Sequence, residues 1–234
     1  MIRGRPEDLG QEPDGMKLQT SAIRCEGSPG KRIHQTPEDW TVNEALRSPA
    51  LWQITVLFAI ILFVTNMLTT HQVAYLQDLH FSPLMSATAL GLMIGMSIIG
   101  RLSSGFLGMH YEGRYLAAFF LALMGFGVLC LVGARSLLWV YLYSALTGIG
   151  FGGMVVLVPT LLGAYFGRTH YSRIIGWTVI GVTLISAGSP SLAGYFYDAT
   201  GKYELPFTIG AVLLFCAIGI ALLTKPPHKS SIQT

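Results

Sequence analysis

Residues 84–108 read LMSATALGLMIGMSIIGRLSSGFLG, a stretch in which Arg101 is the single charged residue. A helix needs about 20 mostly apolar residues to cross the hydrocarbon core of a bilayer, so this stretch predicts a membrane-spanning helix. Ser82 and Pro83 precede it. Serine caps free backbone amides and proline fits the first helical turn, so this pair predicts where the helix starts.

The rest of the chain repeats this pattern after a polar start. Only 12% of the 234 residues are charged, against about 25% in an ordinary soluble domain. Fifteen of the 27 charges lie in residues 1–50. This composition excludes a disordered chain, a nucleic-acid binder and a secreted disulfide scaffold, and indicates an all-α membrane protein. With 84–108 there are six predicted spans; the other five are 51–75, 115–134, 137–165, 174–197 and 204–224.

Six crossings place both chain ends on one side of the membrane. We expect a polar head over 1–50, a six-helix bundle over 51–224 and a tail over 225–234. If the head is cytoplasmic, 13 of the 15 Lys and Arg residues fall on that side, leaving Arg135 and Lys202 outside. The positive-inside rule therefore predicts cytoplasmic termini for a multi-pass protein, which we expect in the plasma membrane.

Glycine and proline are frequent within the predicted spans. Gly91 and Gly95 form a GxxxG pair, and four glycines crowd residues 148–153. Small residues let helices approach closely, so plain packing is one interpretation. Pro159 and Pro190 would interrupt backbone hydrogen bonds in mid-membrane, which is tolerated where a helix bends or lines a cavity. Bent helices favour a moving transporter over an inert anchor.

Arg101 is the residue that apolar packing explains least. Placing an arginine inside a bilayer costs from about 2.5 to over 10 kcal/mol. Ser97 and Ser104 lie four residues before it and three after, which on a helix predicts a polar stripe facing a cavity. A guanidinium there can hold a carboxylate through two parallel hydrogen bonds. The alternative is that Arg101 snorkels to the headgroups at the nearby helix end.

A second polar group lies near the outer end of the first span. Asn66 and Thr70 share one helix face, and His71 and Tyr75 share the neighbouring one. Histidine can relay protons or bind a carboxylate, but near an interface it can also be a hydrogen-bonded helix-end residue.

Membrane catalysis is not indicated. No acidic pair and no HExxH motif occurs in the predicted spans, and Ser189 lacks a convincing base. The three cysteines, Cys25, Cys130 and Cys216, form no CxxC motif and no Cys/His cluster. We expect neither an enzyme nor a bound cofactor or metal.

Several motifs together resemble the carboxy-terminal half of the major facilitator superfamily, in its monocarboxylate-transporter-like and oxalate/formate-antiporter-like branch. The matching segments are THQVAYLQDLHFS at 70–82, IIGRLSSGFLG at 98–108, GIGFGGMVVLVPTLLGAYFGRTHYSRIIG at 148–176 and SPSLAGYFYDATGKYELPF at 189–207. The segment RPEDLGQEPDG at 5–15 resembles the cytoplasmic linker between the two halves.

The resemblance implies a fold and a site. The fold is a six-helix bundle built as a 3+3 inverted repeat, with substrate bound between two such halves. Arg101 would bind the substrate carboxylate. The other implied substrate-binding residues are His71, Asn66, Tyr75 and Ser97, and the implied gating and loop residues are Gly100, Gly105, Arg114, Asp198 and Gly201.

The sequence departs from the family pattern at two places, which changes the expected gating contacts and the expected substrate. Met109 and His110 replace the acid and the base of the usual loop motif, which predicts weaker gating contacts there. Residues 174–197 contain no Lys or Arg, so the lysine that pairs with the arginine in oxalate carriers is missing. A single carboxylate is therefore favoured over a dicarboxylate.

We expect half of a secondary carrier that moves a small organic anion by alternating access. The expected partners are that anion, a coupling proton or counter-anion, the lipid bilayer, and a missing amino-terminal half or second copy, but no nucleic acid. Because the only acidic residue in the six predicted spans is Glu204, the first residue of the last span, a proton-accepting acid would lie in the missing half. The alternatives are a truncated or split-gene product that is inactive alone, and a self-contained carrier working as a homodimer.

Overall fold

The computed structural model describes residues 40–167 and 169–227. Most of the predicted head and the last seven residues of the tail lie outside this part of the chain. Eight helices are found in it: α1 (Val42–Arg47), α2 (Pro49–Asp78), α3 (Pro83–Leu107), α4 (Gly113–Val132), α5 (Leu137–Phe166), α6 (Tyr171–Ala187), α7 (Ser189–Thr200) and α8 (Glu204–Leu223).

Six candidate membrane spans are found at the predicted places. Helices α2, α3, α4, α5 and α8 are each long and apolar enough to cross a bilayer, and α6 and α7 together form the remaining span. Ser82 caps α3 as predicted: its side chain accepts a hydrogen bond from the Met85 amide, and Pro83 opens the helix.

The two prolines behave differently. The fifth span breaks at Gly188, and Pro190 lies at the start of α7, where its missing amide hydrogen costs little. Helix α5 continues through Pro159, which lacks the amide hydrogen for one internal hydrogen bond. Nearby, the Thr160 hydroxyl donates to the Val156 carbonyl at 2.8 Å. A packed helix tolerates the loss of one internal hydrogen bond.

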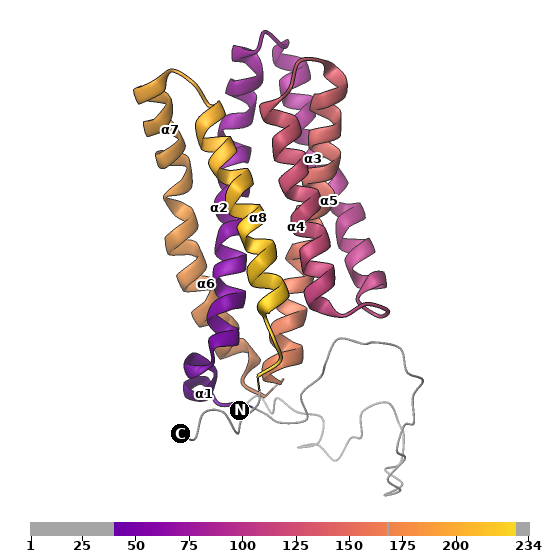
Figure 1. Ribbon diagram of the computed structural model, residues 1–234, viewed down its shortest axis with the longest axis vertical. Coiled ribbons are helices and arrows are strands. Elements are labelled where there is room, and N and C mark those ends of the chain that lie inside the picture. The colour runs from indigo at the N-terminus through magenta and orange to yellow at the C-terminus, as the bar shows by residue number, and fades with distance from the viewer. Residues whose placement is uncertain (1–39, 168, 228–234) are drawn as a thin grey trace, which may run out of the picture.

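The helices stand side by side as an elongated bundle (Figure 1). Helix α5 packs against α3 and α4, α4 also packs against α8, and α2 packs against α6 and α8. Helices α3 and α6 consequently lie at opposite edges of the bundle. In the apolar stretch of each edge span only 28% is buried, against 56% in the apolar stretches of α2, α4 and α5.

Glycines set the close approach of α3 and α5. A Cβ atom on Gly152 would collide with the backbone of Ser97, and one on Gly100 would collide with the Ile149 carbonyl. The glycine cluster of the fourth span is therefore a packing device. Gly91 and Gly95 differ, because a Cβ atom on either would have no neighbour within 4 Å.

Helix α1 forms a small shelf at the end of the bundle where the described chain also finishes (Figure 1). Thr41 and Glu44 form a capping box at its start. The Trp40 amide donates to the Phe166 carbonyl at 3.3 Å, and the two rings meet edge to face at 5.5 Å. At the other end of α1, the Trp52 indole donates to the Leu46 carbonyl at 2.8 Å. These contacts fix the shelf to the bundle.

Candidate functional site

Arg101 lies on the exposed side of α3, six residues before the helix ends at Leu107. At about 1.5 Å per residue, this is about 9 Å from the end of the helix. Across residues 40–167 and 169–227, the one ion pair present joins Arg114 to Glu112, so Arg101 is unpaired there. The structure thus presents a permanent positive charge with five free donors on an apolar helix at the edge of the bundle.

The expected polar stripe around Arg101 is not found. Ser97 and Ser104 are buried on the side of α3 that packs against α5, whereas Arg101 is exposed. The Ser97 hydroxyl donates to the Ile94 carbonyl of its own helix at 2.6 Å. With 3.6 residues per turn, Arg101 is offset around the helix axis from both serines. This offset places it outside the face of α3 that packs against α5. Ser97 therefore does not line the surface that displays Arg101.

His71 joins two spans. Its Nε2 atom lies 2.9 Å from the Pro190 carbonyl oxygen, at the start of α7. A carbonyl can only accept, so Nε2 carries the hydrogen. The imidazole also lies 5.3 Å from the Tyr203 ring, at the start of α8. His71 thus contacts the break in the fifth span, a detail that its place near a helix end did not indicate.

Tyr75, which the resemblance implied as a substrate-binding residue, is buried within the bundle. Its hydroxyl donates to the Val132 carbonyl at 3.2 Å, at the end of α4. Its ring meets Phe207 edge to face at 5.1 Å. Tyr75 and His71 share a helix face as predicted, but each reaches a different neighbour. The aromatic side chain of Tyr75 supports the end of the bundle opposite α1.

Asn66 is half-buried on α2. Its backbone carbonyl accepts hydrogen bonds from the Thr69 and Thr70 hydroxyls, at 3.1 Å and 2.8 Å. Such back-bonding hydroxyls satisfy threonine inside a membrane helix without any partner helix. The polar cluster near the end of α2 is therefore partly self-satisfied.

A buried polar pair between spans was missed by the sequence analysis. The Tyr143 hydroxyl of α5 donates to Gln72 Oε1 of α2, and both side chains are fully buried. The sulfur of Met93 in α3 lies 3.4 Å from the same hydroxyl. Gln72 Nε2 has no partner within the described part of the chain. Gln72 and Tyr143 are each one of several polar residues on their helices, and nothing in their spacing paired them.

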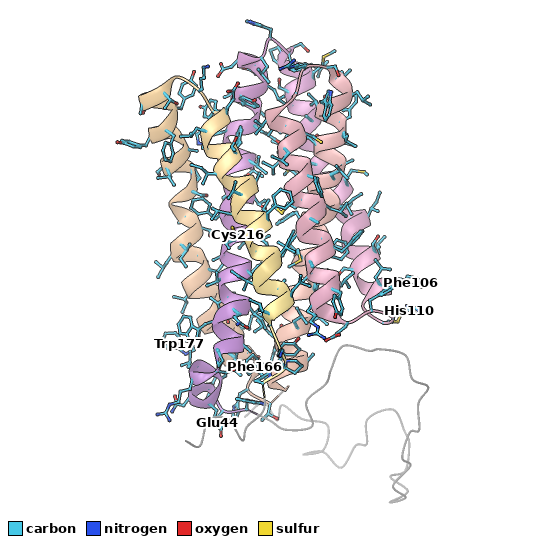
Figure 2. The ribbon with its side chains drawn as sticks, in the orientation of Figure 1. Glu44, Phe106, His110, Phe166, Trp177 and Cys216 are labelled. Carbon is cyan, nitrogen blue, oxygen red and sulfur yellow. The ribbon has the colours of Figure 1, made fainter. Side chains whose placement is uncertain are left out.

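The remaining predicted residues include Arg114 at the start of α4 and Asp198 and Gly201 at the end of α7. At the α1 end, Arg114 forms an ion pair with Glu112 at 2.8 Å, and its guanidinium lies 4.9 Å above the Tyr115 ring. His110 and Phe106 project outward beside this loop (Figure 2). His110 Nδ1 lies 3.1 Å from the Phe106 carbonyl. The ion pair beside this loop thus joins two residues that are two positions apart and does not involve Met109 or His110.

At the opposite end, Gly201 adopts the left-handed conformation with φ of 69° and ends α7. Asp198 is exposed one turn earlier. Burial raises the pKa of the Tyr203 phenol above its usual value, and the charges of Asp78 and Asp198 add to this shift. The Tyr203 ring therefore stays neutral at physiological pH and stacks on Tyr197 with ring centres 4.2 Å apart.

The other two glycines of the predicted motif differ in their surroundings. Gly100 is packed against α5, as described above, whereas a Cβ atom on Gly105 would have no neighbour within 4 Å. No group of three metal-ligating side chains occurs in the part of the chain that the structure covers.

A charged residue within a membrane span commonly marks the pathway of a substrate or an ion. The model of the Major Facilitator Superfamily matches residues 104–234, more than half of the chain. The chain belongs to this superfamily and is a multi-pass membrane protein of a transporter family.

The curated relatives agree. The chain is 27% identical over 171 residues to a 2-nitroimidazole transporter of Escherichia coli, covering 71% of this chain and 42% of that protein. It is 28% identical over 169 residues to monocarboxylate transporter 13 of Rattus norvegicus, covering 70% and 38%. Monocarboxylate transporter 12 of Rattus norvegicus is 26% identical over 172 residues, covering 70% and 35%. The predicted resemblance to the monocarboxylate-transporter-like branch is confirmed, and the chain spans about two fifths of the length of these relatives.

Proposed function

We propose that this chain is the carboxy-terminal half of a secondary carrier that moves a small organic anion, and that Arg101 binds the anion's carboxylate. The observation that carries this proposal is the exposed, unpaired guanidinium on α3. Its planar fork matches the two oxygens of a carboxylate and stays charged at any physiological pH. Two of the curated relatives are named monocarboxylate transporters.

The exposed face of α3 supports the need for a partner. This edge helix displays Arg101 together with Gly91 and Gly95, whose helix surface is open to close approach. An arginine facing lipid alone would be costly. A second six-helix bundle against this face would enclose Arg101 in a central cavity, and the shorter length of this chain relative to its curated relatives is consistent with that.

Replacing Arg101 by lysine distinguishes two possible roles of Arg101: binding the substrate and snorkelling to the headgroups. Lysine reaches the headgroups as arginine does, but it has no planar fork. We expect Arg101→Lys to abolish most uptake of labelled monocarboxylates into liposomes that contain the complete carrier, with both six-helix halves present. Arg135→Lys, in the loop at the opposite end, is the matched control. Equal uptake by the two variants would assign Arg101 to snorkelling and remove it from the site.

The partner is tested separately. We expect the chain alone to be inactive in liposomes, and a reading frame encoding six further spans to lie upstream of its own. Uptake by the chain alone, with a dimer detected by light scattering in detergent, would support the homodimer alternative instead.

A second candidate substrate follows from the relative named as a 2-nitroimidazole transporter. A nitro group also presents two oxygens in one plane, but it carries no net charge. Uptake of 2-nitroimidazole without uptake of monocarboxylates would favour this candidate. The same assay, run with a proton gradient or with a counter-anion inside the liposomes, identifies the coupling ion.

We also propose that the end carrying α1 faces the cytoplasm of a plasma-membrane protein. Arg47, Arg114, Arg173 and Lys225 lie at that end, which is the distribution favoured by the positive-inside rule. The loops at the two ends, with Arg114 in one and Asp198 and Gly201 at the other, would then gate opposite sides. A carboxy-terminal epitope that binds antibody in intact cells would contradict this orientation.

A further inference from the structure

A hollow of about 420 Å³ opens at the α1 end of α6. Its walls come from two elements: α6 supplies most of the lining and the α1 shelf supplies one residue. The lining residues are Val42, Ser172, Arg173, Gly176, Trp177 and Ile180. Figure 2 shows Trp177 projecting from α6 at the edge of the bundle, close to the α1 end where Glu44 lies. The hollow is therefore located where a membrane surface would meet the protein.

The lining changes from polar to apolar along α6. Ser172 and Arg173 lie in the first turn, Trp177 follows one turn later, and Ile180 follows another turn on. At about 1.5 Å per residue, Arg173 and Ile180 are about 10 Å apart along the helix axis. A ligand that fits this gradient carries its charge at the membrane surface and its apolar part deeper in the bilayer.

The hollow is preformed. Gly176 leaves it open, because a Cβ atom there would have no neighbour within 4 Å. The α1 shelf that positions Val42 is held at both ends, by Trp40 against Phe166 and by Trp52 on the Leu46 carbonyl. Little ordering is therefore needed for a ligand to bind, which favours affinity.

The charge in the hollow is available. Arg173 is exposed, and within residues 40–167 and 169–227 it takes part in no ion pair. A guanidinium donates two parallel hydrogen bonds to a phosphate group, and the neighbouring Ser172 hydroxyl is a further donor. Basic pockets beside membrane helices bind anionic headgroups, and tryptophan is enriched at the headgroup level.

We propose that this hollow binds an anionic phospholipid, with the headgroup phosphate on Arg173 and Ser172 and the glycerol and upper acyl chain along Trp177 and Ile180. Soluble phosphate offers the same charged oxygens but leaves the apolar walls uncovered, so a lipid fits the lining better. This proposal does not depend on the transported substrate or on Arg101.

The test measures quenching of Trp177 by lipids with brominated acyl chains. The full chain is reconstituted in phosphatidylcholine vesicles with a fixed fraction of phosphatidylglycerol, and either lipid carries the bromine. The Trp177→Phe variant gives the signal of the other tryptophans, which is subtracted. We expect brominated phosphatidylglycerol to quench Trp177 far more than brominated phosphatidylcholine does at the same fraction.

Arg173→Gln is the decisive variant, and Arg47→Gln is its control. Arg47 is an exposed arginine at the same end but outside the hollow, so both variants lose the same charge. We expect Arg173→Gln to weaken phosphatidylglycerol binding about tenfold, the loss of one charge-assisted contact. Arg47→Gln should retain the preference.

Three results would overturn the proposal. Equal losses in the two variants would show general surface attraction. Displacement of the quenching lipid by millimolar inorganic phosphate would show a site for soluble phosphate. Absence of quenching by either lipid would show that protein covers the hollow.

Discussion

Because α3 and α5 are in close contact, we expect one added methyl group between them to lower the stability of the protein substantially. Gly152→Ala places a Cβ atom against three backbone atoms of Ser97: the carbonyl oxygen, the carbonyl carbon and the Cα atom. Backbone atoms cannot rotate away as a side chain can, so the two helices must separate. Overpacking of this kind costs about 1–3 kcal/mol. We expect the free energy of unfolding of Gly152→Ala to lie below that of a control variant without this contact by that amount.

Gly91→Ala is the matched control on α3. It makes the same chemical change at a position with no neighbour within 4 Å. Alanine gains up to about 1 kcal/mol of helix propensity at either position, so the difference between the two variants isolates the packing cost. Stability is measured on the purified chain by titration with a denaturing detergent, with helix content followed by circular dichroism. Equal stability of Gly152→Ala and Gly91→Ala would refute the close packing of α3 and α5.

Two further predictions concern residues away from this contact. Tyr143→Phe removes the donor to Gln72 and leaves a buried amide oxygen unpaired, so we expect a loss of about 1–3 kcal/mol in the same titration; unchanged stability would contradict this hydrogen bond. Gly201→Ala places a Cβ atom at a φ of 69°, so we expect the free energy of unfolding to fall by about 1–2 kcal/mol. Gly219→Ala, inside α8 with open space around it, should cause no loss of stability. Equal effects of the two variants would argue against the left-handed turn.

Local sequence predicted the elements well for a physical reason. The bilayer demands long apolar helices with all backbone groups bonded internally, so hydropathy alone located six spans. Ser82 and Pro83 marked the start of α3 correctly because capping is a local interaction. At Pro159 the sequence indicated a lost backbone hydrogen bond, but it did not show that α5 continues through this residue.

The site was predicted less completely. Arg101 could be selected because a charge inside an apolar run has few explanations. Its separation from Ser97 depends on which side of α3 meets α5, and that side is set by glycines on both helices. Likewise, the hydrogen bond from His71 to the Pro190 carbonyl joins residues 119 positions apart. No local pattern records such a contact.

The sequence by itself determined the class of protein, the number of spans and the one charge that membrane packing does not explain. These follow from composition and helical period, which each segment carries without its neighbours. Only the tertiary structure decided which faces are covered: Tyr75 and Ser97 inside the bundle, and Arg101 and the Arg173 hollow on opposite edge helices. The physical reason is that burial depends on how neighbouring helices pack, and that packing depends on small residues far apart in the chain.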